Sequence, residues 1–198
     1  MTGPGVVAWI RDQLRRRIRT NLSRCPYPVT LIMDSQSVKG ASTVSRATRG
    51  FGPATLINGR KRHVAVDTKG SPVMIMVTPA DMQDRDAARE LLWRLRLTHP
   101  RVTQLWADSA YAGKLVDWAE DLLRITLKTV SRLKDAKGFV VLPRRWRVER
   151  TLGWIMNAPR NARDYEHLPQ RSEAHLNWSL ITLMTRRLLR LNSWSRRD

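Results

Sequence analysis

Two aspartates that follow short apolar segments are the first candidates for catalytic chemistry. The segments PVTLIMD (28–34) and VTQLWAD (102–108) have the length and composition of buried strands, and they end in Asp34 and Asp108. Ligands of open α/β sheets collect at the carboxyl ends of the strands. Two carboxylates side by side there repel each other until a divalent ion neutralises them. The alternative is that each aspartate only caps the turn or helix that follows it.

Glu149 is the candidate for a third carboxylate, because it is the only acidic residue between Asp135 and Asp164. It lies in RRWRVERTLGWIM (144–156), whose apolar spacing predicts a helix with Glu149 at the border of the buried face. That buried face would consist of Val148, Leu152 and Ile155. The alternative is an exposed ion pair with Arg145, four residues earlier.

Three carboxylates of this kind suit phosphodiester chemistry. Cleavage by water or by a 3′-hydroxyl passes through an in-line transition state with negative charge on the phosphoryl oxygens, and two ions about 4 Å apart can activate the nucleophile and stabilise the leaving oxygen. Oxygen ligands without neighbouring His or Cys favour Mg²⁺ or Mn²⁺ over Zn²⁺.

The charge of the chain predicts a polyanionic partner. Its 198 residues include 36 Lys and Arg against 17 Asp and Glu, a formal net charge of +19, while 42% of residues are hydrophobic and can build a core. Arginine outnumbers lysine, which favours bidentate contacts with phosphates and bases. Nucleic acid is the commonest such partner, although a ribosomal-type protein or an arginine-rich genome would give a similar composition.

The sequence also predicts the compartment. Cys25 is the only cysteine, so neither an internal disulfide nor a cysteine-based zinc site can form. The chain has no apolar run of membrane-spanning length and no secretory signal pattern at its start. We therefore expect a protein of a reducing cytoplasm, not associated with a membrane.

Short strands alternate with helices along the chain, which predicts an α/β fold with a mixed sheet. The Ser-, Thr- and Gly-rich segment 35–61 is expected to be a loop. The expected strands are 28–34, a hairpin of 61–68 and 72–78, 102–108 and 124–130. The expected helices are 7–20, 82–97, 112–122, 144–156 and about 171–190.

Five segments together resemble a known family, the DDE transposases of the insertion sequence five group. They are IMDSQSVK (32–39), NGRKRHVAVDTKG (58–70), PADMQDRDAA (79–88), LWADSAYAG (105–113) and GFVVLPRRWRVERTLGWI (138–155). The resemblance implies a ribonuclease-H-like catalytic domain at 28–190, between a basic helical lead-in (1–27) and a basic tail (191–198). It also implies that Asp34, Asp108 and Glu149 hold Mg²⁺ or Mn²⁺, with two ions expected, to cleave DNA at insertion-sequence ends and transfer the strands.

Two features depart from the family pattern. Relatives carry a Y-x2-R-x3-E-x6-K signature, and this chain keeps Arg145 and Glu149 but has Leu142 and Met156 at the Tyr and Lys positions. Relatives also carry a further N-terminal DNA-binding segment of the helix-turn-helix kind, whereas this chain begins at the last helix before the catalytic domain. The expected alternatives to an active transposase are therefore a truncated remnant that binds DNA without cutting it and a nuclease of the same fold.

Basic residues near the aspartates and around Glu149 are predicted to contact double-stranded DNA, both terminal inverted repeats and target. For the basic run before the second strand, the alternative is an edge strand charged against aggregation. The predicted DNA contacts are Arg60, Lys61, Arg62, His63, Tyr111, Arg144, Arg145, Arg147 and Arg150. Because two DNA ends must be held together, the mechanism implies a homodimer.

Overall fold

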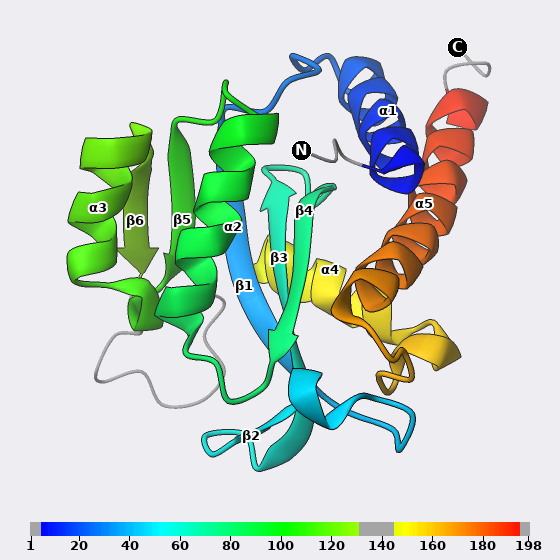
Figure 1. Ribbon diagram of the computed structural model, residues 1–198. Helices are drawn as coiled ribbons and strands as arrows, with labels where there is room; N and C mark the ends of the chain where they lie inside the picture. The colour runs from blue at the N-terminus through cyan, green and yellow to red at the C-terminus, as the bar shows by residue number, and fades with distance from the viewer. Residues whose placement is uncertain (1–4, 131–144, 195–198) are drawn as a thin grey trace, which may run out of the picture.

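The computed structural model describes residues 5–130 and 145–194, and Figure 1 shows the order of their helices and strands. The helices are α1 (Val6–Asn21), α2 (Asp84–Thr98), α3 (Lys114–Leu123), α4 (Trp146–Met156) and α5 (Pro169–Trp194). The strands are β1 (Thr30–Lys39), β2 (Gly50–Gly52), β3 (Ile57–Asp67), β4 (Pro72–Pro79), β5 (Gln104–Asp108) and β6 (Thr126–Val130). Single 3₁₀ turns lie at Arg46–Thr48, Ser109–Tyr111 and Pro159–Asn161.

The six strands form one mixed sheet. β1, β5 and β6 are parallel neighbours, and β3 lies antiparallel to β1 on the other side. β4 and the short β2 pair with β3 in turn, both antiparallel to it. The order β4-β3-β1-β5-β6, with only β3 reversed among these five strands, is that of a ribonuclease-H-like fold, so the predicted fold class is confirmed.

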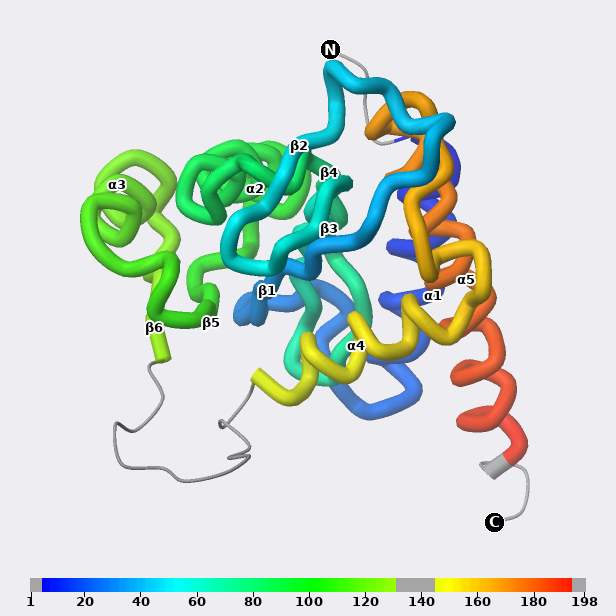
Figure 2. Tube along the Cα trace, turned by 90° about the horizontal axis from the view of Figure 1, so that it is seen from below, coloured from blue at the N-terminus to red at the C-terminus, as the bar shows by residue number. Residues whose placement is uncertain are grey.

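Helices cover both faces of the sheet because the strand residues alternate between two cores. Leu31 and Met33 of β1 join the core beneath α2 and α3, whereas Ile32 joins the core beneath α4 and α5. Figure 2 shows α2 and α3 on one side of β1 and β3, with α4 on the other. α1 packs against α5. Within the described ranges, no helix has the length and apolar character needed to cross a bilayer.

The predicted helices and strands are all present among the described residues, with one difference that matters for the site. β1 continues to Lys39 through the segment predicted as a loop, and β3 begins at Ile57 within the same segment. The two strands stay paired to Lys39 opposite Gly59, so backbone pairing stabilises a stretch whose side chains give no strand signal. Asp34 therefore lies within a strand and not at its end. The apolar segment FVVLP (139–143) lies outside the described residues.

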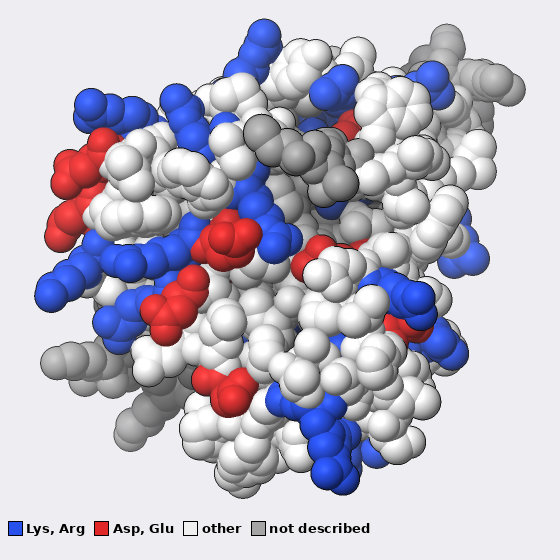
Figure 3. Space-filling model, viewed as in Figure 1, with Lys and Arg blue, Asp and Glu red and all other residues white. Residues whose placement is uncertain are grey.

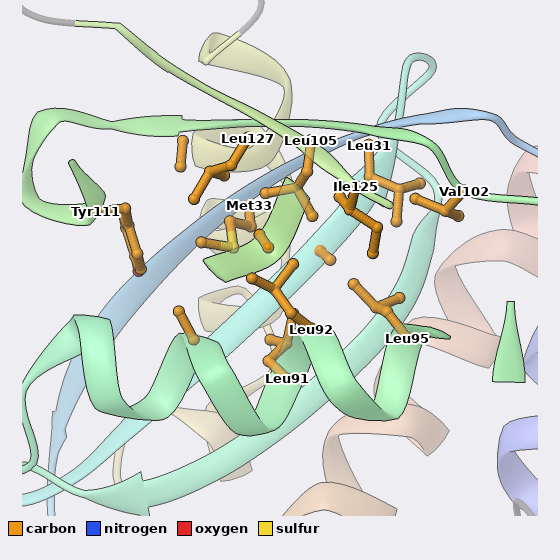
Figure 4. Packing of buried hydrophobic residues seen from close by; sticks show 14 of the residues in the cluster. Leu31, Met33, Leu91, Leu92, Leu95, Val102, Leu105, Tyr111, Ile125 and Leu127 are labelled. Carbon is orange, nitrogen blue, oxygen red and sulfur yellow. The ribbon is translucent and has the colours of Figure 1, made fainter. Parts of the chain in front are cut away.

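The core beneath α2 gives a direct test of the fold. Leu92 has no exposed surface and points from α2 toward the sheet, among the residues labelled in Figure 4. Leu92→Ala should lower the free energy of unfolding by about 2–5 kcal/mol, because it removes buried methyl groups and leaves a cavity. Urea denaturation measures this change. Leu97→Ala, at a position on the same helix that is 60% exposed, should cost less than about 0.5 kcal/mol; equal losses in the two variants would contradict the packing.

Candidate active site

The register of two parallel strands brings Asp34 and Asp108 to the same level of the sheet. Ile32 lies opposite Trp106, and the same register carried two residues further places Asp34 opposite Asp108. Residues two apart in a strand share a face, so both aspartates point to the α4 side, as Ile32 does. Direct pairing of β1 with β5 ends at Ile32, so the two strands separate where the carboxylates stand.

One oxygen of each aspartate is fixed by a backbone amide. Oδ1 of Asp34 accepts a hydrogen bond from the Ser35 N–H at 2.8 Å, and Oδ1 of Asp108 accepts one from the Ala110 N–H at 2.8 Å. Asp108 thus caps the 3₁₀ turn that follows it, as its alternative interpretation proposed. Capping uses only one oxygen, so Oδ2 of each aspartate stays available for a cation.

α4 brings Glu149 to the same place. Val148, Leu152 and Ile155 are buried in the core beneath α4, which fixes the rotation of the helix against β1 and β3. Glu149 borders that buried face, and its side chain is 43% exposed. It is the most accessible of the three candidate carboxylates.

The Arg145 guanidinium lies among all three carboxylates. Nη2 is 3.1 Å from Oδ2 of Asp34 and 3.5 Å from Oε1 of Glu149, and Nη1 is 3.8 Å from Oδ2 of Asp108. The i, i+4 pair with Glu149 foreseen as an alternative is therefore present, within a larger cluster. We call Asp34, Asp108 and Glu149 the carboxylate cluster.

Burial controls the electrostatics of the cluster. Burial raises the pKa of Asp34 above its ordinary value and repulsion from Asp108 adds to the rise, while Arg145 opposes it. Burial alone would lower the pKa of Arg145, but attraction to Asp34, Asp108 and Glu149 outweighs it and raises that pKa. The guanidinium thus stays charged, and Asp34 retains a need for further positive charge.

No three Asp, Glu, His or Cys side chains in residues 5–130 and 145–194 are close enough to hold an ion as they stand. The Arg145 side chain lies between the members of the carboxylate cluster. All potential ligands in the cluster are oxygens, the type that Mg²⁺ and Mn²⁺ prefer. The carboxylate oxygens therefore fit such an ion, provided that the Arg145 guanidinium moves away from the three carboxylates.

Arg60 was predicted to contact DNA, but its side chain is completely buried. Its guanidinium donates hydrogen bonds to the carbonyls of Thr48, Glu166 and His167 at 2.8–3.1 Å, and it pairs with Asp164 at 3.3 Å. Arg60 connects two loops to the middle of the sheet and cannot reach a phosphate. The buried Asp164 was not singled out from sequence, since its partner lies 104 residues away.

Arg62 and His63 also lie inside the protein, which contradicts their predicted DNA contacts. Arg62 is 1% exposed and donates to the Asn161 carbonyl at 2.7 Å. His63 is 2% exposed and hydrogen-bonds the Thr78 hydroxyl at 2.9 Å. β3 lies between β1 and β4, so the alternative of a charged edge strand is also wrong.

The remaining predicted contacts differ in accessibility. Tyr111 is 2% exposed within the core beneath α2 and α3, so its predicted contact with substrate is wrong too. Lys61 pairs with Asp84 at 3.1 Å. Arg147 and Arg150 are partly exposed on α4 and stay predictions, as does Arg145. Arg144 lies outside the described residues.

Comparison with known proteins relates the chain to one family. Residues 27–184 match the family described as transposase DDE domain. No curated protein sequence matches significantly.

Three solved structures are similar in fold. The integrase catalytic core domain of HTLV-2 has a TM-score of 0.45 and 15% identity over 79% of this chain and 86% of that one. The simian T-cell lymphotropic virus intasome gives 0.47 and 19%, over 79% and 48% of the two chains. The Mos1 mariner paired end complex gives 0.40 and 11%, over 96% and 63%. The strand order described above identifies the fold independently of these similarities.

The burial of His63 predicts a pH dependence of stability. Burial lowers its pKa from 6.5 to about 4, so the folded protein keeps the ring neutral where the unfolded chain takes up a proton. Stability should therefore fall as the pH drops from about 6.5 to 4, with about 2–3 kcal/mol of the loss due to this residue. Urea denaturation at pH 7 and pH 4.5 should show a smaller loss for His63→Gln than for the parent. Equal losses would contradict the burial of a neutral ring.

Proposed function

The chain belongs to the transposase DDE domain family, and we propose that it is a DNA transposase that cleaves DNA at insertion-sequence ends and joins the ends to target DNA. The observation that carries this proposal is the carboxylate cluster with one guanidinium at its centre. The resemblance to the insertion sequence five group supports the choice of substrate. The net charge of +19 suits a DNA partner.

The carboxylate cluster would hold Mg²⁺ or Mn²⁺ during the reaction. Such an ion would lower the pKa of a bound water and neutralise charge on the phosphoryl oxygens. Backbone amides keep Oδ1 of Asp34 and Asp108 in place, so Oδ2 of each is the natural ligand atom. Glu149, on α4, is exposed enough to reorient as DNA binds.

The chain's other groups position the DNA. Arg145 lies at the N-terminal end of α4. Once its guanidinium leaves the carboxylates, it can donate hydrogen bonds to a DNA phosphate. We also propose that two copies act together in the bacterial nucleoid, since two ends have to be joined in one reaction.

Loss of the carboxylates tests the catalytic assignment. Asp34→Asn and Asp108→Asn should each abolish Mn²⁺-dependent nicking and strand transfer on DNA that carries the element's terminal repeats, because a neutral amide is a poor ligand for a hard cation. Gel assays measure cleavage, and fluorescence anisotropy should show that both variants still bind DNA. Asp121→Asn, an exposed acid on α3, is the matched control and should cleave normally.

Normal cleavage by both aspartate variants would overturn the assignment. A parent protein that binds DNA with no cleavage in Mg²⁺ or Mn²⁺ would favour the binding-only remnant. Equal cleavage of terminal-repeat and random DNA would favour a nuclease.

The position of Arg145 predicts competition with the metal. Arg145→Ala should tighten Mn²⁺ binding by about tenfold or more, because the three carboxylates lose their shared cation. Isothermal titration calorimetry without DNA measures the dissociation constant. Arg147→Ala, also at the N-terminal end of α4, is the control and should leave this constant unchanged, since in the described structure Arg147 stacks on Trp146 and has no acidic partner. Unchanged or weaker binding by Arg145→Ala would contradict the competition.

A further inference from the structure

A second cationic site lies on the other side of α4 from the carboxylate cluster. A groove of about 730 Å³ runs between α4 and α5. Four arginines and one tryptophan provide most of its chemistry: Arg150, Trp154, Arg186, Arg187 and Arg190. We call it the arginine groove. No acidic side chain lines it within the described part of the chain.

The arginines of the groove have no acid to neutralise them. Within the described ranges, no ion pair joins any of the four to a carboxylate. Asp67 attracts Arg187 but is itself paired with Arg19 at 2.8 Å. The groove thus keeps positive charge that no carboxylate of the described residues neutralises.

Two of the four guanidiniums are fixed and two are free. Arg150 and Arg187 both donate to the Lys69 carbonyl, at 3.1 and 3.2 Å. Arg150 also stacks on the rings of Trp146 and Trp154, 4.6 and 4.5 Å from their centroids. Arg186 and Arg190 are exposed on α5, where the described structure gives their guanidiniums no hydrogen-bond partner. The groove therefore combines one hydrogen-bonded arginine from each helix with two arginines of α5 that have no hydrogen-bond partner in the described structure, and all four can donate to anionic oxygens.

The distribution of acids separates this surface from the opposite one. All of the residues that line the groove come from two segments, 150–163 and 174–194, and neither segment contains Asp or Glu. Over α2 and α3, acidic side chains accompany the basic ones, as Figure 3 shows. The positive charge of the arginine groove is therefore not accompanied by acidic side chains from its own segments.

We propose that the arginine groove binds backbone phosphates of double-stranded DNA, as a contact surface separate from the carboxylate cluster. This inference rests on the proposed function for the identity of the polyanion. Arg150 directly follows Glu149 on α4, so the groove and the carboxylate cluster occupy neighbouring faces of one helix. Guanidinium forks suit phosphate oxygens, and contacts with backbone phosphates carry no base readout, so binding in the groove is expected to be independent of sequence.

The test measures the salt dependence of duplex binding in EDTA. For Arg186→Ala/Arg190→Ala, the affinity for a random-sequence duplex at about 0.1 M salt should fall by about tenfold or more. The slope of log K against log salt should decrease by about 0.9 for each phosphate that the variant no longer neutralises. Fluorescence anisotropy measures both quantities. Arg89→Ala/Arg96→Ala, which removes the same charge from α2, is the matched control and should change the slope little.

Two outcomes would overturn the inference: equal slopes for the two double variants, whether changed from the parent or not, or tight binding of polyglutamate in preference to the duplex. An unchanged melting temperature of Arg186→Ala/Arg190→Ala excludes misfolding as the cause of any weaker binding. Because EDTA prevents cleavage, the result does not depend on catalysis. If the parent protein does not cleave DNA but Arg186→Ala/Arg190→Ala lowers the salt slope as expected, only the catalytic proposal is overturned. If the parent protein cleaves DNA but the salt slope of this variant is unchanged, only the proposal for the groove is overturned.

Discussion

Three residues of parallel pairing between β1 and β5 determine where the aspartates meet. The pairing places Ile32 opposite Trp106, and this register brings Asp34 and Asp108 to the same level on the same face of the sheet. A shift of one residue would turn Asp34 to the α2 face and Met33 into the cluster. The core beneath α4 then sets the distance of Glu149, because the buried face of α4 packs on the same side of the sheet. Hydrophobic packing and strand register thus hold mutually repelling charges together, and Arg145 neutralises them.

A strongly basic chain has to distribute its arginines between interior and surface. Arg60 and Arg62 lie inside. Carbonyls and the Asp164 carboxylate accept hydrogen bonds from Arg60, and the Asn161 carbonyl accepts one from the terminal Nη1 of Arg62. Leaving any of these donors unpaired would cost several kcal/mol, so their partners are as necessary as the arginines. The arginines of the groove between α4 and α5 remain without acidic partners in the described structure, and we propose them as contacts for DNA. Net charge alone does not distinguish these two groups.

Local patterns predicted the helices and the hairpin, because the spacing of apolar residues depends only on residues close together in the chain. Five sequence segments predicted the family. The continuation of β1 to Lys39 was missed, since pairing with β3 stabilises it and its own side chains do not. The burial of Arg60 was missed for a similar reason: its partners Asp164 and Glu166 lie more than 100 residues later in the chain. The Arg145–Glu149 pair was foreseen from spacing, but the contacts of Arg145 with Asp34 and Asp108 depend on tertiary structure.

The turn between β3 and β4 has a consequence for the shape of the surface. Gly70 has a φ of +78°, and a methyl group there would come within 2.9 Å of the Arg150 guanidinium. The preceding carbonyl, of Lys69, accepts hydrogen bonds from both Arg150 and Arg187 and so uses both of its lone pairs. The spacing of these two cations is therefore set by the backbone conformation of one glycine turn. Replacing residues of α4 or α5 changes which side chains line the surface. Changing the turn instead moves the carbonyl that holds the Arg150 and Arg187 guanidiniums in place.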